Sequence, residues 1–292
     1  MRDPRVLGAY LACCVIWALS WIFIKIGIRD FPPILFAGIR CVLSAGVLFL
    51  YARLIGSRVL LQTVSYRSNF VVGLFFFGVP FVTVFIGEQT VDASVTAVVF
   101  ACSPTFSVTM AWIFLKERLS PPRALGVLLG LAGVLYLYLP ALAASGFQAN
   151  TGLLLILVGA LAGSIGMILA KKSLHHESPA TALPIQMILV APLILLGGAL
   201  TESCHDARWT ASFAFSLAYL AIFASGVAYA LYFWLLKHLP VAQLVYVDFL
   251  YPVLSIIFAR LILGEPVSPR LAASTALIIC GGLLTSRSQP TT

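Results

Sequence analysis

Charged side chains are scarce in this sequence. Aspartate, glutamate, lysine and arginine together make up 10% of the 292 residues, whereas 61% are hydrophobic. In an ordinary soluble domain about a quarter of the residues are charged. A chain with a mean hydropathy of +1.04 has too few polar side chains to cover a water-soluble fold. The composition therefore excludes a soluble globular protein and predicts an integral membrane protein.

Several signatures of chemistry are also missing. No Gly-rich phosphate loop of the Walker A kind is present, which argues against ATP-driven transport by this chain alone. The six cysteines show no C-x-x-C spacing, and all but Cys204 lie in apolar stretches, so neither a disulfide framework nor a zinc site is predicted. Lysines and arginines are spread singly through short loops, which indicates a topology signal and not a nucleic-acid partner. We expect no metal, no cofactor and no nucleic acid.

Long apolar runs fill the sequence instead. Crossing a hydrocarbon core of ~30 Å takes about 20 residues of helix. Proline or polar residues mark most of the short loops between the runs. We predict an all-α integral membrane protein with ten transmembrane helices, at residues 5–27, 33–55, 69–90, 92–115, 121–140, 151–171, 179–201, 211–236, 240–263 and 268–286.

The basic residues predict the orientation of these spans. With a cytoplasmic N-terminus, twelve lysines and arginines fall on the inner face and five on the outer face. Cytoplasmic loops of membrane proteins have the excess of basic residues. We therefore expect both termini in the cytoplasm.

Two stretches 148 positions apart are alike. SPTFSVTMAWIFLKERLSP at 103–121 and YPVLSIIFARLILGEPVSP at 251–269 share seven of nineteen positions without a gap, Pro104 and Pro252 among them. A weaker match at a spacing of 146 pairs Lys25 with Lys171, Pro33 with Pro179, Ile39 with Ile185 and Ala45 with Ala191. Self-similarity at a fixed spacing indicates a duplicated unit.

Each copy of the unit contains five predicted spans. An odd number of crossings turns the second copy upside down in the membrane, and inverted repeats are an architecture of secondary transporters. We predict a single membrane domain made of a first repeat, 1–145, and a second, inverted repeat, 146–292, around a central cavity. A duplicated bundle with no transport role is the alternative.

Four sequence blocks together suggest a family. They are WALSWIFIKIG at 17–27, PPILFAGIR at 32–40, the paired P-x-x-S…L-x-E-x-x-S-P blocks of the two halves, and the G-x-x-x-G-x-x-G pattern of the fifth span. In this order they resemble the drug/metabolite transporter superfamily, in its ten-helix EamA-type branch, over essentially the whole chain. The resemblance implies export of small metabolites, commonly amino acids, across a bacterial inner membrane. One departure is that Gln186 stands in the second half where the first has Arg40.

One carboxylate is predicted close to the midplane of the membrane. Asp248 lies about eight residues, or ~12 Å, from the inner end of its span, and it shares a helix face with Tyr251 and Ser255. Ionisable groups inside a membrane face the bundle interior or water. Asp248 is predicted to bind a substrate amine or to take up a proton. Satisfaction by neighbouring hydroxyls, holding helices together, is the alternative.

Aromatic and hydroxyl side chains are the second site signal. A buried Tyr or Trp needs a partner for its OH or NH group. A cavity with aromatic rings, hydroxyls and one or two charges suits an amphipathic solute such as an amino acid, although each such residue could also serve packing alone. With Asp248, the predicted substrate-binding residues are Trp17, Trp21, Thr83, Ser103, Ser107, Tyr229, Tyr232, Tyr246 and Tyr251.

Three ionisable residues form a predicted charge network towards the outer face. Arg40 lies ~10 Å below the outer edge, where it is expected to pair with Glu88 or Asp92. Binding of a substrate carboxylate is its alternative role. Lys25 is two residues from the end of its span and is expected to extend to the lipid headgroups, with a role at the outer mouth as the alternative.

Prolines and glycines supply candidate hinges and contacts. Pro104 and Pro252 remove a backbone donor from equivalent spans, and with Pro80 they are predicted hinges for gating, with static packing as the alternative. Small residues spaced as in the fifth span allow close helix approach. They could alternatively form a dimer face, so both a monomer and a homodimer fit the sequence.

These features predict a secondary transporter that exports amino acids or similar small amphipathic metabolites by alternating access. Its partners would be a small-molecule substrate and the lipid bilayer. Efflux of cationic or lipophilic drugs is the alternative within transport. An intramembrane enzyme is the alternative outside it, and would need Ser164 with His175 or His176. The sequence leaves the substrate open, and it leaves open whether export is facilitated or coupled to proton exchange through Asp248 or Glu88.

Overall fold

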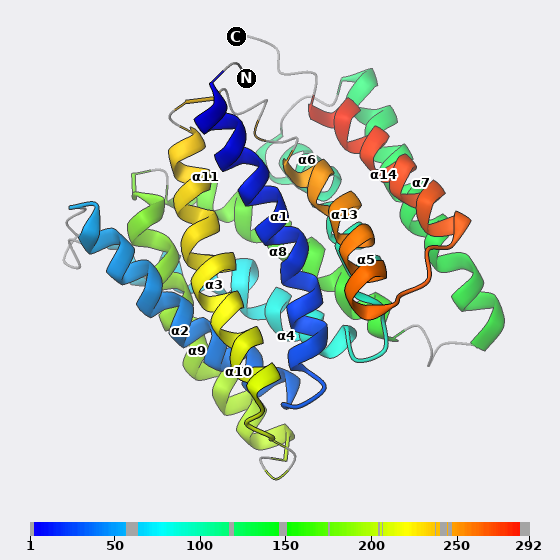
Figure 1. Cartoon of the computed structure of the whole chain (residues 1–292). Coiled ribbons are helices and arrows are strands. Elements are labelled where there is room, and N and C mark those ends of the chain that lie inside the picture. Colours follow the sequence, from blue (N-terminus) through cyan, green and yellow to red (C-terminus); the bar gives the residue numbers. More distant parts are fainter. Residues whose placement is uncertain are drawn as a thin grey trace.

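The computed structural model is a bundle of helices, and all regular structure in the residues it describes is helical. Helix α1 begins and helix α14 ends at the same end of the bundle (Figure 1). The described residues are 3–56, 64–116, 120–145, 151–174, 176–203, 205, 207–236, 238–239, 244 and 247–286.

Helices lie over each of the predicted spans. The first half of the chain contains α1 (Pro4–Gly27), α2 (Pro33–Leu54), α3 (Tyr66–Gly73), η2 (Leu74–Gly78), α4 (Val79–Gly87), α5 (Ala93–Phe100), α6 (Ser103–Leu115) and α7 (Pro121–Ser145). The second half contains α8 (Thr151–Ser173), α9 (Pro179–Thr201), α10 (Ala211–Ala218), η5 (Tyr219–Val227), α11 (Ala228–Leu236), α13 (Val247–Phe258), η6 (Ala259–Leu263) and α14 (Pro269–Ser286). The segments η2, η5 and η6 are π-helical.

The outside of the bundle is apolar. Seven helical stretches of the described residues are long and apolar enough to cross a membrane, and Pro121–Leu137 and Pro269–Thr285 are shorter apolar helices. Leu200 and Leu261 have exposed fractions of 76% and 75%. Large apolar side chains at such exposure are stable against lipid tails and unfavourable against water. The chain is therefore a multi-pass membrane protein.

Proline marks the beginning of many of these helices. It occupies the first turn of α1, α2, α9 and α14, where the missing N–H would have no partner within the helix. At α1 the preceding Asp3 completes the cap, because its side chain accepts a hydrogen bond from Arg5 N at 2.9 Å.

The three predicted hinge prolines lie in different backbone settings. Helix α5 ends at Phe100 and α6 begins at Ser103, so the helix is interrupted shortly before Pro104. Pro80 follows the wide turns of η2. Pro252 instead lies inside the continuous helix α13, whose geometry widens only at η6. Two of the three prolines thus adjoin a change in the helical path.

Glycines allow two helices of opposite halves to touch. A Cβ on Gly281 of α14 would lie 2.6 Å from the carbonyl oxygen of Gly126 and 2.6 Å from the nitrogen of Gly130, both on α7. Further along, Gly133 faces Ile278. Residue numbers increase along α7 where those of the facing α14 residues decrease, so the two helices are antiparallel. The glycine pattern of the fifth span serves this intramolecular contact.

Other contacts recur between the two halves. Helices α2 and α9 are antiparallel neighbours, since Leu35 faces Gly198 and Gly38 faces Leu195. Helix α1 packs against α13 and α11 of the second half, and its counterpart α8 packs against α6 and α4 of the first. Helices α1 and α8 thus each pack mainly against helices of the opposite half.

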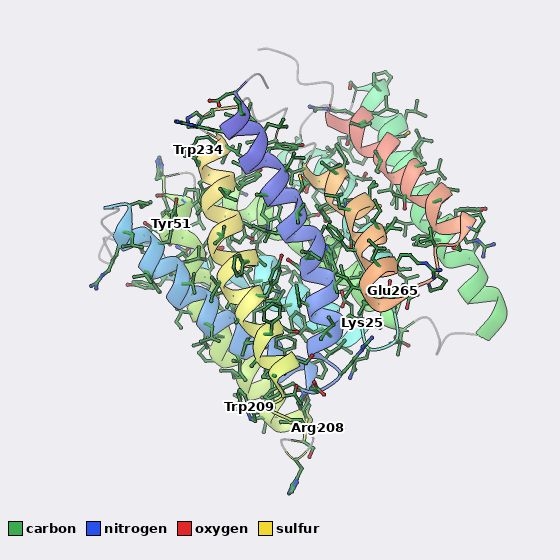
Figure 2. All side chains as sticks on the ribbon, viewed as in Figure 1. Lys25, Tyr51, Arg208, Trp209, Trp234 and Glu265 are labelled. Carbon is green, nitrogen blue, oxygen red and sulfur yellow. The ribbon has the colours of Figure 1, made fainter. Side chains whose placement is uncertain are left out.

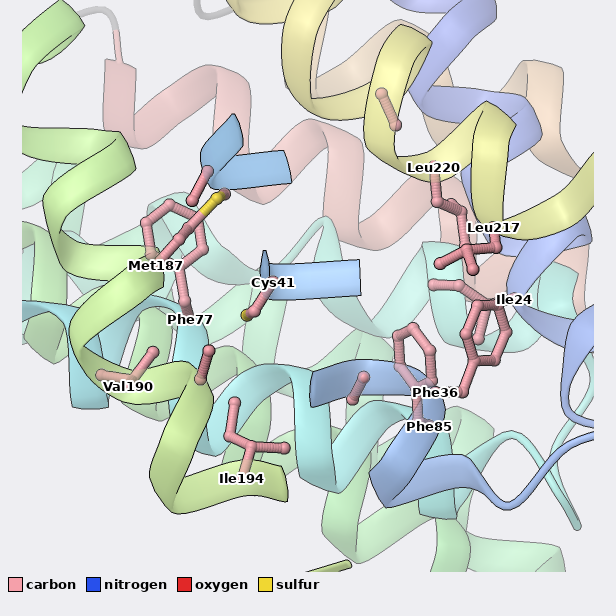
Figure 3. Close-up of a cluster of buried hydrophobic side chains, with 14 of the residues drawn as sticks. Ile24, Phe36, Cys41, Phe77, Phe85, Met187, Val190, Ile194, Leu217 and Leu220 are labelled. Carbon is pink, nitrogen blue, oxygen red and sulfur yellow. The ribbon is translucent and has the colours of Figure 1, made fainter. Parts of the chain in front are cut away.

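A large apolar cluster joins the halves between α2, α4, α9 and α10 (Figure 3). It contains the fully buried rings of Phe36, Phe85 and Phe213, with Phe36 and Phe213 in edge contact at 5.0 Å between ring centroids. Met187 contributes from α9. This core fixes α2 and α4, the two helices that position Arg40 and Glu88.

Candidate functional site

Six of the predicted site residues lie on α1 or beside it, at the boundary between the halves. Trp17 of α1 contacts two tyrosines of α11, with ring centroids 5.9 Å from Tyr229 and 5.6 Å from Tyr232. Its indole Nε1 donates to the carbonyl of Ala224 at 3.2 Å. The NH group of Trp17 is thereby satisfied, and its ring is left as an apolar wall.

One turn further along α1, a second tryptophan has an unsatisfied donor. The ring of Trp21 stacks on Tyr251 of α13 at 6.3 Å and lies 5.0 Å from Phe100. Its buried Nε1 finds no hydrogen-bond partner among the described residues, and the same is true there of the buried hydroxyl of Ser255. Buried polar groups are normally bonded, so an unpaired donor here calls for a ligand or water.

Asp248 lies in the first turn of α13, where the positive end of the helix dipole favours a carboxylate. Its charge acts on the hydroxyls of Tyr232 and Tyr251 and on the thiols of Cys13 and Cys14, which places it beside the N-terminal half of α1. None of the residues that the structure describes donates a hydrogen bond to it. The carboxylate is half-buried and available.

The predicted hydroxyl residues of the first half lie elsewhere, against α8. Thr83 faces Gly159 and donates to the carbonyl of Pro80 at 3.3 Å. Ser103 donates to the carbonyl of Phe100 at 2.6 Å. These hydroxyls are satisfied by nearby backbone carbonyls. The same is true of the neighbouring α8 serine of the enzyme alternative, because Ser164 donates to the carbonyls of Ala160 at 2.9 Å and Ser103 at 3.1 Å.

The last three candidates can be placed briefly. Ser107 contacts the sulfur of Met167 on α8 at 3.9 Å. Tyr246 and His175 lie outside the described residues. The side chains that gather at the half boundary are therefore Trp17, Trp21, Tyr229, Tyr232, Asp248 and Tyr251.

Lys25 does not extend to the headgroups as expected. Its ammonium group donates to the backbone carbonyl of Glu88, and to that of Val91 at 2.7 Å. These carbonyls follow the end of α4 and have no helical partner, so a cation is stabilised there. Lys25 thus joins α1 to the α4–α5 connection.

The prediction that Arg40 forms an ion pair is also wrong: among the described residues its guanidinium contacts an aromatic ring and no carboxylate. The Arg40 guanidinium lies 4.2 Å from the ring centroid of Phe81, and its Nε has no hydrogen-bond partner in the part of the chain that the structure describes. Both carboxylate oxygens of Glu88 are likewise buried and unpaired there. The aromatic face takes up the guanidinium in place of a carboxylate.

Carboxylates cap helices at the end of the bundle where α1 ends, a role that the sequence patterns did not reveal. Glu265, which follows η6, accepts hydrogen bonds from the backbone nitrogens of Ala93 at 2.8 Å and Ser94 at 3.0 Å, and from the Ser94 hydroxyl at 2.6 Å. Figure 2 shows Glu265 and Lys25 near one another towards this end. In the sequence Glu265 is only the glutamate of the second L-x-E-x-x-S-P block, and its partners are about 170 residues away.

Two further carboxylates accept hydrogen bonds across the halves at the same end. Glu202 accepts from the backbone nitrogens of Ile34 at 2.8 Å and Leu35 at 2.9 Å at the start of α2. Asp30 accepts from the hydroxyl of Thr210, the cap of α10, at 2.6 Å. We refer to Asp30, Glu202 and Glu265 as the three capping carboxylates.

Replacing Glu265 with Gln is expected to lower the free energy of unfolding in mixed micelles by about 2–3 kcal/mol. The carboxylate of Glu265 is buried and accepts three hydrogen bonds, whereas Gln is neutral and has an NH₂ donor in place of one acceptor oxygen. Glu202→Gln is the matched control with a smaller expected loss, because Glu202 is more exposed. Equal loss in both variants would contradict the ranking by burial.

A family model matches the chain twice. The model is described as the EamA-like transporter family, and the matches cover residues 6–139 and 150–287. The chain belongs to the EamA-like transporter family. The sequence resemblance to the drug/metabolite transporters is thereby confirmed.

Relatives of this EamA-like protein are transporters by name. The chain is 25% identical over 278 residues to the "Uncharacterized transporter YoaV" of Bacillus subtilis (strain 168), covering 95% of each chain. It is 26% identical over 275 residues to the "Uncharacterized inner membrane transporter YedA" of Escherichia coli (strain K12), covering 92% of this chain and 87% of that protein. It is 29% identical over 288 residues to the "Probable amino-acid metabolite efflux pump" of Salmonella typhimurium (strain LT2), covering 93% and 91%.

A solved structure shares the fold. One protein crystal structure superposes with a TM-score of 0.67 over 97% of this chain and 96% of the other, at 20% sequence identity. At that identity the likeness concerns the fold alone. Together with the family, these comparisons describe a membrane transporter, and they point away from an enzyme.

Proposed function

We propose that this EamA-like protein exports amino acids or similar small amphipathic metabolites by alternating access. The proposal rests on the groups around α1. Within the described part of the chain, the carboxylate of Asp248, the Trp21 indole NH and the Ser255 hydroxyl have no hydrogen-bond partner, and Trp17 with its tyrosine neighbours forms an aromatic wall beside them. Polar groups without partners, set among aromatic rings, suit a solute with one charged and one apolar part.

The chemistry of such a site is binding and release. Asp248 would receive the amino group of the substrate, and the rings of Trp17 and Tyr232 would cover its apolar side chain. A carboxylate beside aromatic faces favours an ammonium group both by charge and by cation–π attraction. The Trp21 and Ser255 donors would meet acceptor atoms of the solute.

Alternating access in this proposal uses two inverted five-helix repeats, residues 1–145 and 146–292, with ten crossings. Supporting observations are the twofold family match, the antiparallel pairs α2–α9 and α7–α14, and the contacts that recur between the halves. One repeat rocking against the other would expose the boundary site first to one face and then to the other. Pro104, Pro252 and Pro80 are the proposed hinge positions.

The proposed location is a bacterial inner membrane with both termini in the cytoplasm. The excess of basic residues on the inner face supports this orientation, and the name of the similar YedA of Escherichia coli supports the membrane. The end of the bundle where α1 ends, with the three capping carboxylates, then faces outward. Amino acids are proposed as substrates because the similar Salmonella protein is named an amino-acid metabolite efflux pump.

Transport assays in proteoliposomes test the proposal. The purified protein should exchange radiolabelled L-phenylalanine, L-leucine or L-threonine across the bilayer, and tetraethylammonium should not accumulate. Repeating the assay with an imposed pH gradient distinguishes proton exchange from facilitated export. Flux of tetraethylammonium without flux of any amino acid would replace the proposal by drug efflux, and flux of neither would overturn both.

A further inference from the structure

We propose that Arg40 and Glu88 form a second binding site, nearer the end of the bundle where α1 ends, which holds the carboxylate and the ammonium group of a zwitterionic substrate. This inference rests on the proposed export of amino acids and goes beyond the cluster around Asp248. Its basis is a buried guanidinium and a buried carboxyl group that form no ion pair with each other.

Arg40 projects from α2 against aromatic rings and has no anionic partner among the described residues. Only 8% of its surface is exposed, its guanidinium lies 4.2 Å from the Phe81 centroid and 5.7 Å from that of Phe85, and Nε is unbonded. Aromatic faces hold the planar guanidinium without using its donors. Tyr229 of the second half lies within electrostatic range, so the group is at the boundary between the halves.

The equivalent position of the second repeat provides an internal comparison. Gln186 on α9 is also buried, but its side-chain amide donates to Asn69 at 3.2 Å, and Asn69 in turn donates to Glu177 at 2.8 Å. The polar group at this position is therefore satisfied in one half. In the other half the Nε of a charged guanidinium has no partner among the described residues, which is unfavourable for a purely structural residue.

Glu88 supplies a buried carboxyl group. It follows the last residue of α4 and is fully buried, and neither carboxylate oxygen has a hydrogen-bond partner within the described part of the chain. Lys25 interacts with the Glu88 backbone carbonyl, so that ammonium group holds the α4 end and does not bond the carboxylate. The carboxylate oxygens of Glu88 are thus free to accept hydrogen bonds from an ammonium group.

The spacing suits an α-amino acid. Phe81, Phe85 and Glu88 follow one face of α4, and the seven residues from Phe81 to Glu88 correspond to ~10 Å of helix. The Arg40 guanidinium lies over the first two rings. An α-amino acid with its charged groups about 3 Å apart, and a hydrogen bond of about 2.8 Å at each end, spans most of that distance.

The two sites lie at different levels of α1. Asp248 interacts with Cys13 and Cys14, whereas Glu88 adjoins Lys25, eleven residues or ~16 Å further along the helix. A substrate moving outward would meet the carboxylate of Asp248 first and the side chains of Arg40 and Glu88 second. The second site requires both a carboxylate and an ammonium group, so it would separate amino acids from simple amines.

Binding of three matched compounds to the protein in nanodiscs tests the second site. They are phenylalanine, phenethylamine, which has no carboxylate, and 3-phenylpropionate, which has no amine. Arg40→Met should weaken phenylalanine binding at least about 30-fold and strengthen phenethylamine binding, because a buried repulsive charge is removed. Glu88→Gln should weaken phenylalanine binding and strengthen 3-phenylpropionate binding. A purely structural role would shift all three affinities in one direction.

Gln186→Met is the control at the equivalent position, and it should lower stability without changing the order of the three affinities. Wild-type binding of phenylalanine that persists unchanged in Arg40→Met and Glu88→Gln would overturn the second site alone. Absence of wild-type binding by phenylalanine and by leucine would overturn the second site together with amino-acid export. The transport assay with tetraethylammonium then tells whether export of another class of solute remains.

Discussion

Replacing Asp248 with Asn is expected to lower amino-acid transport by a factor of about 10–100 while leaving the amount of folded protein unchanged. An ammonium group bonded to a carboxylate contributes about 1.5–3 kcal/mol, and the neutral amide keeps the size of the side chain but loses its charge. The fold has little dependence on this residue, since none of the described residues donates a hydrogen bond to it. Initial rates in proteoliposomes measure the effect.

Asp3→Asn provides the comparison for this experiment. Asp3 caps α1 at an exposed position, so its substitution changes the same functional group away from the site. Transport by Asp3→Asn should match that of the wild type. Unchanged transport kinetics in Asp248→Asn would contradict substrate binding by this carboxylate and would indicate a structural role.

Replacing Gly281 with Leu should destabilise the protein by about 3 kcal/mol, towards the upper end of the usual effect of overpacking. The first atom of the new side chain would lie 2.6 Å from the carbonyl oxygen of Gly126 and 2.6 Å from the nitrogen of Gly130. Both are backbone atoms of α7, so relief requires the helices to separate. Unfolding in mixed micelles measures the change.

Gly46 on α2 is the matched control for that substitution. No atom lies within 4 Å of a Cβ built there, so Gly46→Leu meets open space on the exposed side of α2. Because Leu also favours helix more than Gly does, this variant should be as stable as the wild type or slightly more so. A loss of equal size at both positions would contradict the close α7–α14 contact.

The helical class and the position of helices were predictable because their causes are local. Runs of about 20 apolar residues and prolines at helix starts are written in neighbouring residues, and helices occur over every predicted range. The glycines of the fifth span pointed to close packing, and Gly126 and Gly130 indeed meet Gly281. The breaks were less visible. Pro104 adjoins one, yet Pro184 and Pro192, which had not been singled out, lie inside the unbroken helix α9.

The partners of charged residues were not predictable in the same way. The position of Lys25 near a helix end predicts contact with the headgroups, but it bonds the carbonyls of Glu88 and Val91. A buried arginine such as Arg40 is expected to have a carboxylate partner, and it lies instead over Phe81. The partners of both residues depend on which helices pack together, and a single sequence does not show which helices are neighbours.

The three capping carboxylates have a consequence for how the bundle opens. Each connects a residue of one half to a helix start of the other, and all three lie at one end. These hydrogen bonds join the same two halves but lie on separate helices. A rigid-body rotation of one half would strain all of them at once, and water would have to replace their donors together. In the proposed rocking of the halves, opening of this end is therefore expected to be a single cooperative step, and the closed end is expected to be the more populated state.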